Sequence, residues 1–137
     1  MDLLRCKARL SVLWLTMAIG TVASMFLGLL TPGTIKDVMA GEWGGTELSE
    51  GMLVFMAFFF IIPIVVAILS LTLNGSANRW MNFVLGIIWF LWLIFEIIEH
   101  ATMEGTVYIA SYLMFAAGII IAAYIIYFAW KLPKAEA

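Results

Sequence analysis

Glu96, Glu99 and His100 are the side chains of this sequence whose types and spacing best suit chemistry. Residues three and four positions apart share one face of an α-helix, so these side chains converge if the segment is helical. Trp92 lies one turn earlier on the same face. Carboxylates and an imidazole can hold a divalent cation through oxygen and nitrogen, or pass protons. We therefore predict a ligand-binding site on Trp92, Glu96, Glu99 and His100, of which the last three are candidate metal ligands.

Glu96 differs from its polar neighbours because apolar residues flank it on both sides. Ionisable residues at membrane depth usually face the protein interior and mark a site or pathway. We therefore expect Glu96 to point into the protein. Glu99, His100 and Glu104, in contrast, are also typical of the point at which a helix leaves the lipid.

The sequence lacks the motifs of the common cofactor-dependent enzymes. It has no glycine-rich dinucleotide motif, no Walker lysine and no haem-attachment motif. Cys6 is the only cysteine, which excludes an intramolecular disulfide and a zinc site on paired cysteines. A di-metal centre draws glutamates from several helices, so here it would need Glu47, Glu50 or Glu104 as well. We name no catalytic residue and expect no cofactor other than a divalent cation.

The composition indicates which kind of structure positions these residues. Hydrophobic residues make up 65% of the 137 residues and charged residues 12%, about half the charged share of a soluble domain. A helix needs about 20 residues to cross the hydrocarbon core, where backbone polar groups must be satisfied within the segment. Pro63 is expected to kink the second such helix. We predict one all-α transmembrane domain over residues 1–137, a four-helix bundle with spans at about 10–31, 51–73, 79–100 and 106–130.

Basic residues set the expected orientation of the spans. Cytoplasmic loops are enriched in lysine and arginine, and Lys36 alone falls on the opposite side from the rest. This places both termini in the cytoplasm of a multi-pass protein of the cell (inner) membrane, and it places the acidic loops 31–50 and 100–105 outside. The basic residues that share the cytoplasmic side are Arg5, Lys7, Arg9, Arg79, Lys131 and Lys134.

A stripe of small residues on the first span indicates how helices associate. Thr16, Gly20, Ser24 and Gly28 follow one another at intervals of four, and such a face lets a second backbone approach closely in lipid. We predict that it packs against another helix, within the bundle or in an oligomer. The expected partners are therefore the lipid bilayer and a second copy or another membrane protein, whereas the net charge of −2 does not suggest nucleic acid.

Four short segments carry a resemblance to a known family. The chain resembles an uncharacterised prokaryotic family of small four-span integral membrane proteins, and the resemblance covers nearly its whole length. It implies the size and the number of spans, and no activity. Members often carry an acidic residue just before the proline of the second span, where this chain has Ile61 and Ile62. The segments are residues 7–14 (KARLSVLW), Gly41 with Gly44-Gly45, Pro63-Ile64 and residues 77–82 (ANRWMN).

Three functions fit these observations. The first is a non-enzymatic binding or transport module that takes a cation or polar small molecule at an acidic outer site. The second is a membrane-embedded enzyme that uses Glu96, Glu99 and His100 as acid and base on a lipid-like substrate. The third is an accessory subunit of a larger membrane complex. A polar vestibule would favour the first, a lateral opening to lipid the second, and a sealed dry bundle the third.

Overall fold

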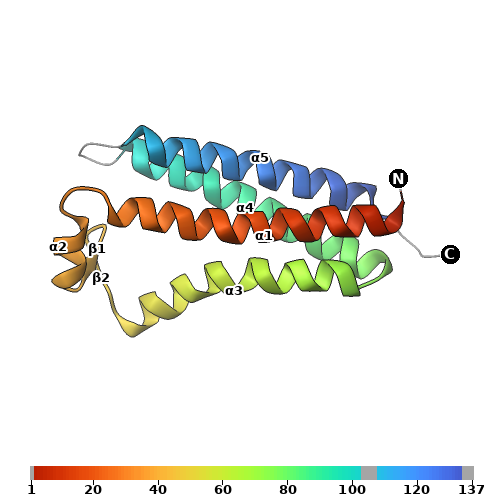
Figure 1. The fold of residues 1–137 in the computed structure, drawn as a ribbon, viewed down its shortest axis with the longest axis horizontal. Coiled ribbons are helices and arrows are strands. Elements are labelled where there is room, and N and C mark those ends of the chain that lie inside the picture. Colours follow the sequence, from red (N-terminus) through yellow and green to blue (C-terminus); the bar gives the residue numbers. More distant parts are fainter. Residues whose placement is uncertain (1, 103–107, 134–137) are drawn as a thin grey trace.

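Four long helices run side by side along the molecule (Figure 1). The computed structural model describes residues 2–102 and 108–133. The predicted all-α four-helix fold is confirmed, and each predicted span corresponds to one long helix. The long helices are α1 (Leu3–Leu29), α3 (Glu50–Thr72), α4 (Gly75–Thr102) and α5 (Ile109–Lys131), and the shorter elements between α1 and α3 are α2 (Thr34–Met39), β1 (Glu42–Trp43) and β2 (Thr46–Glu47).

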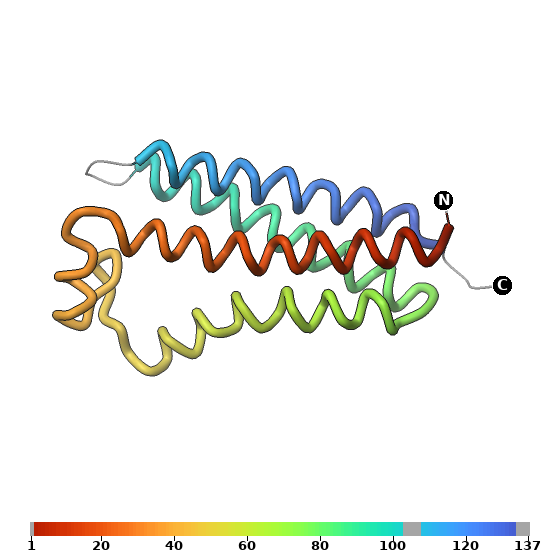
Figure 2. The backbone as a smooth tube through the Cα atoms, viewed as in Figure 1, coloured from red at the N-terminus to blue at the C-terminus, as the bar shows by residue number. Residues whose placement is uncertain are grey.

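The two ends of the bundle are built differently. We call the end that carries α2, β1 and β2 the hairpin end, and the end that holds the start of α1, the link 73–74 and the end of α5 the termini end. Helix α1 packs on α3 and α5, and α4 packs on α5. Figure 2 shows α3 running close to α1 near the termini end and diverging from it toward the hairpin end.

Pro63 lies inside α3, which the structure shows as one uninterrupted helix. Proline has no N–H to give to the carbonyl four residues earlier, and its ring crowds that carbonyl. The group affected here is the carbonyl of Phe59. In Figure 2 the helix turns away from α1 in the half that precedes the proline.

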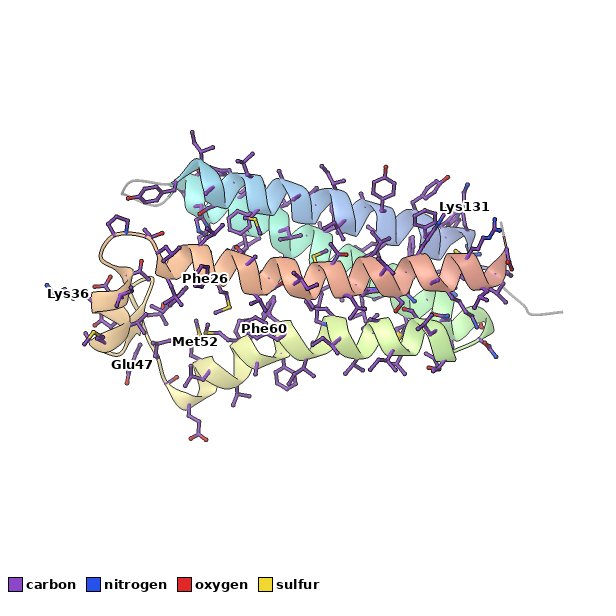
Figure 3. All side chains as sticks on the ribbon, viewed as in Figure 1. Phe26, Lys36, Glu47, Met52, Phe60 and Lys131 are labelled. Atoms are coloured by element: carbon purple, nitrogen blue, oxygen red, sulfur yellow. The ribbon has the colours of Figure 1, made fainter. Side chains whose placement is uncertain are left out.

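The outer faces of the bundle are apolar along its length (Figure 3). All four long helices are long and apolar enough to cross a membrane. Each of them carries large apolar side chains that are exposed in the described part of the chain, and a bilayer would remove these side chains from water. The chain is therefore a multi-pass membrane protein. Examples of these side chains are Ile19, Phe58, Ile68, Val84, Leu91, Leu113 and Ile120.

The hydrophobic core lies mainly in the half of the bundle next to the termini end. Leu10, Trp14 and Ile125 are completely buried there. Glycine lets α4 and α5 approach closely, since a Cβ added at Gly86 would lie 3.0 Å from a carbon of Ile126. The remaining buried apolar residues of this core include Cys6, Val66, Ala67, Ala129 and Leu132.

A buried network of polar side chains links α1, α3 and α4 in the same half. The indole Nε1 of Trp14 donates to Oδ1 of Asn82 at 2.7 Å, and the hydroxyl of Ser70 donates to the same oxygen at 2.9 Å. The amide of Asn82 donates to Asn78, whose own amide donates to the carbonyls of Ser70 and Leu73 at 2.9 Å. Within the described residues, no buried side-chain nitrogen or oxygen lacks a partner.

Two basic side chains at the termini end, Arg79 and Lys7, are buried and bind neighbouring elements of the bundle. Arg79 is buried, donates to the carbonyl of Leu132 at 3.2 Å and lies 4.4 Å from the ring centre of Trp130. Lys7 is also buried and donates to Oδ1 of Asn74 in the link between α3 and α4. These contacts fasten α4 to α5 and α1 to the α3–α4 link.

A β-hairpin folds back over the opposite end of α1, in the segment predicted to be an outer loop. The two-residue turn between β1 and β2 is Gly44-Gly45, and both glycines have positive φ angles, 56° and 78°. Glycine adopts such angles without strain, and they suit a tight hairpin. The turn places Trp43 against α1, where a Cβ added at Gly28 would lie 3.4 Å from the indole.

Candidate functional site

A cavity of about 300 Å³ lies between the four long helices, in the half of the bundle nearer the hairpin end. All four helices contribute to its wall, and Trp43 of the hairpin joins them. Most of the lining is apolar, with a few polar side chains among it. A concave, mainly apolar space with few polar groups is the usual form of a small-molecule site.

Glu96 and His100 are the ionisable side chains that line this cavity. They lie on successive turns of α4, and 22% of the Glu96 side chain and 30% of the His100 side chain remain exposed. The expectation that Glu96 points into the bundle agrees with this position. Nδ1 of His100 lies 3.8 Å from Oε2 of Glu96.

The hydrogen bond of His100 defines what the imidazole can offer to a ligand. Its Nδ1 lies 2.8 Å from the backbone carbonyl oxygen of Glu96. A carbonyl can only accept, so in the neutral ring Nδ1 carries the proton and Nε2 keeps a free lone pair. The ring also packs edge-on against Phe115 of α5, with its centre 4.9 Å away. The hydrogen bond to Glu96 and the contact with Phe115 thus fix the orientation of the imidazole, and its Nε2 remains available as an acceptor.

Glu99, the third predicted ligand, does not join the other two. It is exposed and does not line the cavity. Each residue advances the helix by about 100°, so Glu99 and His100 lie on opposite sides of Glu96, and in this structure the cavity includes His100 and not Glu99. Glu47 and Glu50 are exposed as well, and Glu104 lies outside the described residues.

The predicted metal site on Glu96, Glu99 and His100 is accordingly not formed. Across residues 2–102 and 108–133, no group of three His, Cys, Asp or Glu side chains is placed to hold a metal ion. Glu96 and His100 together can supply one carboxylate and one imidazole nitrogen. A transition-metal or zinc site usually draws three or four ligands from the protein.

Trp92 lines the cavity, as expected from its place on the face of Glu96. It belongs to an aromatic group between α3 and α4, with ring centres 5.0 Å from Phe59 and 6.2 Å from Phe55. Trp89, one turn deeper, lies 5.6 Å from Phe59 and 5.7 Å from the buried Trp14. These rings fill the space between α3 and α4 and separate the cavity from the core at the termini end.

The stripe of small residues on α1 lines the cavity instead of packing against a helix of this chain. Thr16 is exposed, and Gly20 and Ser24 are half-buried. A Cβ added at Gly20 would have no atom within 4 Å, and at Gly28 it would meet the hairpin residue Trp43 rather than a helix. Within the chain, then, the small side chains leave room for the cavity and for the indole.

Several wall residues were not identified from the sequence. Met17, Met25, Met56 and Met114 line the cavity, although scattered methionines are normally read as core filling. Trp43 was not singled out either, because its place depends on the hairpin. The pair Gly44-Gly45 between short runs is a recognised hairpin signal and would have suggested the turn. The convergence of methionines from three helices depends on the tertiary arrangement.

The long apolar helices and the cavity between them define an α-helical multi-pass membrane protein with a candidate binding site. A family model described as a family of unknown function (DUF6326) matches residues 4–137, and the chain belongs to this family. The resemblance to an uncharacterised family is confirmed in that respect. No curated protein and no solved structure matches the chain.

Proposed function

We propose that this chain is a non-enzymatic binding module that takes a cation or polar small molecule into the cavity near the hairpin end. One observation carries the proposal. The ionisable pair of this helix face, Glu96 and His100, lines a cavity of about 300 Å³ to which all four long helices contribute. An ionisable pair that lines a cavity can bind a ligand that enters it. An ionisable pair at the membrane interface without a cavity would contact only water and lipid headgroups.

The packing between the cavity and the termini end favours binding over transport. Trp89, the lining residue of α4 farthest from the hairpin end, is buried and packs edge to face against the buried Trp14, with the ring centres 5.7 Å apart. A transport pathway would have to part these rings and the network around Asn82. In the arrangement of the described residues, the cavity therefore belongs to the hairpin end of the bundle and does not continue to the termini end.

The orientation follows from the charges at the two ends. The basic residues Arg5, Arg9 and Arg79 lie toward the termini end, as does Lys131, whereas Glu47 lies at the hairpin end (Figure 3). By the positive-inside tendency, the termini end faces the cytoplasm and the hairpin end faces outward. We infer that the cavity takes its ligand from the outer side of the cell (inner) membrane.

The test compares Glu96→Gln with Glu99→Gln in the full chain, reconstituted in phosphatidylcholine nanodiscs. Both variants remove one carboxylate from α4, but only Glu96 lines the cavity. Thermal unfolding would be measured with metal cations, organic cations and neutral polar molecules, because a ligand that binds the folded state raises the unfolding midpoint. We expect at least one compound to raise the midpoint of the parent and of Glu99→Gln but not of Glu96→Gln. A panel in which no shift depends on Glu96 would contradict the proposal.

A further inference from the structure

We propose that the ligand is an organic ammonium ion, with a small apolar or aromatic body and one positively charged nitrogen. The inference rests on the proposed function and names the class of molecule that the cavity selects. It depends on three properties of the wall: the negative charge that its polar pair can carry, the aromatic side chains in it, and its lack of a complete set of metal ligands.

The polar pair offers acceptors and negative charge. An ionised Glu96 carboxylate can only accept hydrogen bonds, and Nδ1 of His100 already spends its proton on the Glu96 carbonyl at 2.8 Å. Nε2 of the neutral ring is therefore a second acceptor. Among the described residues that line the cavity, none is lysine or arginine. A carboxylate or phosphate ligand would be repelled by an ionised Glu96 and would find no lysine or arginine there, whereas a cationic nitrogen would be attracted to Glu96.

The aromatic lining suits a cation that carries little water. Trp43, Trp92 and Phe115 reach the wall from the hairpin, α4 and α5. Aromatic faces attract ammonium groups through their quadrupole, and tryptophan does so most strongly. Methionine side chains complete the wall with polarisable, flexible surface that can adapt to an apolar body.

An inorganic cation fits the same wall poorly. Mg²⁺ and Ca²⁺ need about six or more oxygen ligands, and Mg²⁺ loses its own water reluctantly. In the described part of the chain no three metal-binding side chains come together, and a mainly apolar wall cannot replace the missing waters. The volume of about 300 Å³ also exceeds what a bare ion fills and lies at the small end of organic-ligand sites.

The test uses two probes of nearly the same shape, benzyltrimethylammonium and its neutral isostere neopentylbenzene. Binding to the full chain would be followed by tryptophan fluorescence in phosphatidylcholine nanodiscs, with empty nanodiscs correcting for partition into lipid. We expect the cation to bind about tenfold more tightly than the isostere, or better, because only the cation gains from the carboxylate and the ring faces. We expect Glu96→Gln to remove that preference and Glu99→Gln to keep it.

The outcomes separate the ligand class from the binding function. Equal binding of the two probes in the parent, which needs no variant to interpret, would overturn the ammonium assignment. So would a titration in which Mn²⁺ raises the unfolding midpoint through Glu96 while benzyltrimethylammonium does not, but that result would leave the proposed binding function intact. If no compound of any class depends on Glu96, both the assignment and the proposed function are wrong.

Discussion

The two halves of the bundle use polar side chains in opposite ways. Near the termini end, Asn82 and its partners are buried, and their hydrogen bonds are made to one another across three helices. Near the hairpin end, Glu96 and His100 are partly exposed beside a cavity, and they keep acceptor capacity for something else. Polar groups that satisfy one another hold helices together, whereas groups left with spare capacity beside open space make a site.

The backbone explains why the two halves differ. Small residues at contact positions let helices close on one another near the termini end, as at Gly86. Toward the hairpin end α3 diverges from α1, and aromatic side chains such as Phe59 and Trp92 fill the space between α3 and α4. These large rings keep α3 and α4 apart, and the small residues of α1 do not fill the space that is left. That space is the cavity.

The largest effect on stability is expected from Asn82→Leu, in the half of the bundle next to the termini end, which we call the closed half. This change leaves the Trp14 indole N–H and the Asn78 carboxamide oxygen buried without their partner. An unsatisfied buried polar group costs about 1–3 kcal/mol, so the free energy of unfolding should fall by about 3 kcal/mol. Unfolding in mixed micelles of increasing SDS content measures it. Ser76→Ala is the control, since Ser76 is exposed on the same helix; an equal loss in the two variants would contradict the role of the network.

A smaller effect is expected where α4 and α5 touch. A Cβ at Gly86 would lie 3.0 Å from Ile126 and 3.1 Å from Ile125, closer than ordinary contact. Overpacking of this kind costs about 1–3 kcal/mol, which exceeds the roughly 0.5–1 kcal/mol that alanine gains over glycine in a helix, so Gly86→Ala should lower the free energy of unfolding. The same SDS titration checks it. Unchanged stability would show that α4 and α5 can separate at no cost.

Gly20→Ala is the matched change in the half nearer the hairpin end, which we call the open half. Here the free energy of unfolding is expected to rise rather than fall. A Cβ at Gly20 would meet nothing within 4 Å, and alanine favours a helix over glycine by about 0.5–1 kcal/mol. The variant should therefore be slightly more stable than the parent. Gly20→Leu should fill part of the cavity and weaken binding of benzyltrimethylammonium without unfolding the protein. A large loss of stability in either variant would indicate that this stripe packs against a second copy.

The sequence was sufficient for the helices but only partly for the site. Hydropathy alone predicts four spans, because each helix is apolar enough to be recognised without its neighbours. The depth of Glu96 in its span predicted an inward position, and in the structure Glu96 lines the cavity. Glu99 was grouped with it because spacing along a helix does not say which neighbour of Glu96 turns toward the interior; that depends on where α5 packs.

The closed half was hardest to predict, since its partners lie far apart in the chain. Asn78 and Asn82 are four residues apart and suggest a shared helix face. The third member, Trp14, lies 68 residues before Asn82 and reads from sequence as an interfacial anchor. Local spacing could show a polar face on α4, but only the fold shows that an indole of α1 completes it.

Water access to the two halves tests the central claim most directly. Ser24 lines the cavity and Ser70 is completely buried in the network, so Ser24→Cys and Ser70→Cys form a matched pair in a Cys6→Ser background. Maleimides react with the thiolate, which forms in water and not in a sealed apolar core. In intact cells, a membrane-impermeant maleimide should label the Ser24→Cys variant, and benzyltrimethylammonium should slow that labelling, while the Ser70→Cys variant stays unlabelled. Equal labelling of the two, or labelling only of Ser70→Cys, would contradict a bundle that is closed at one end and opens outward at the other.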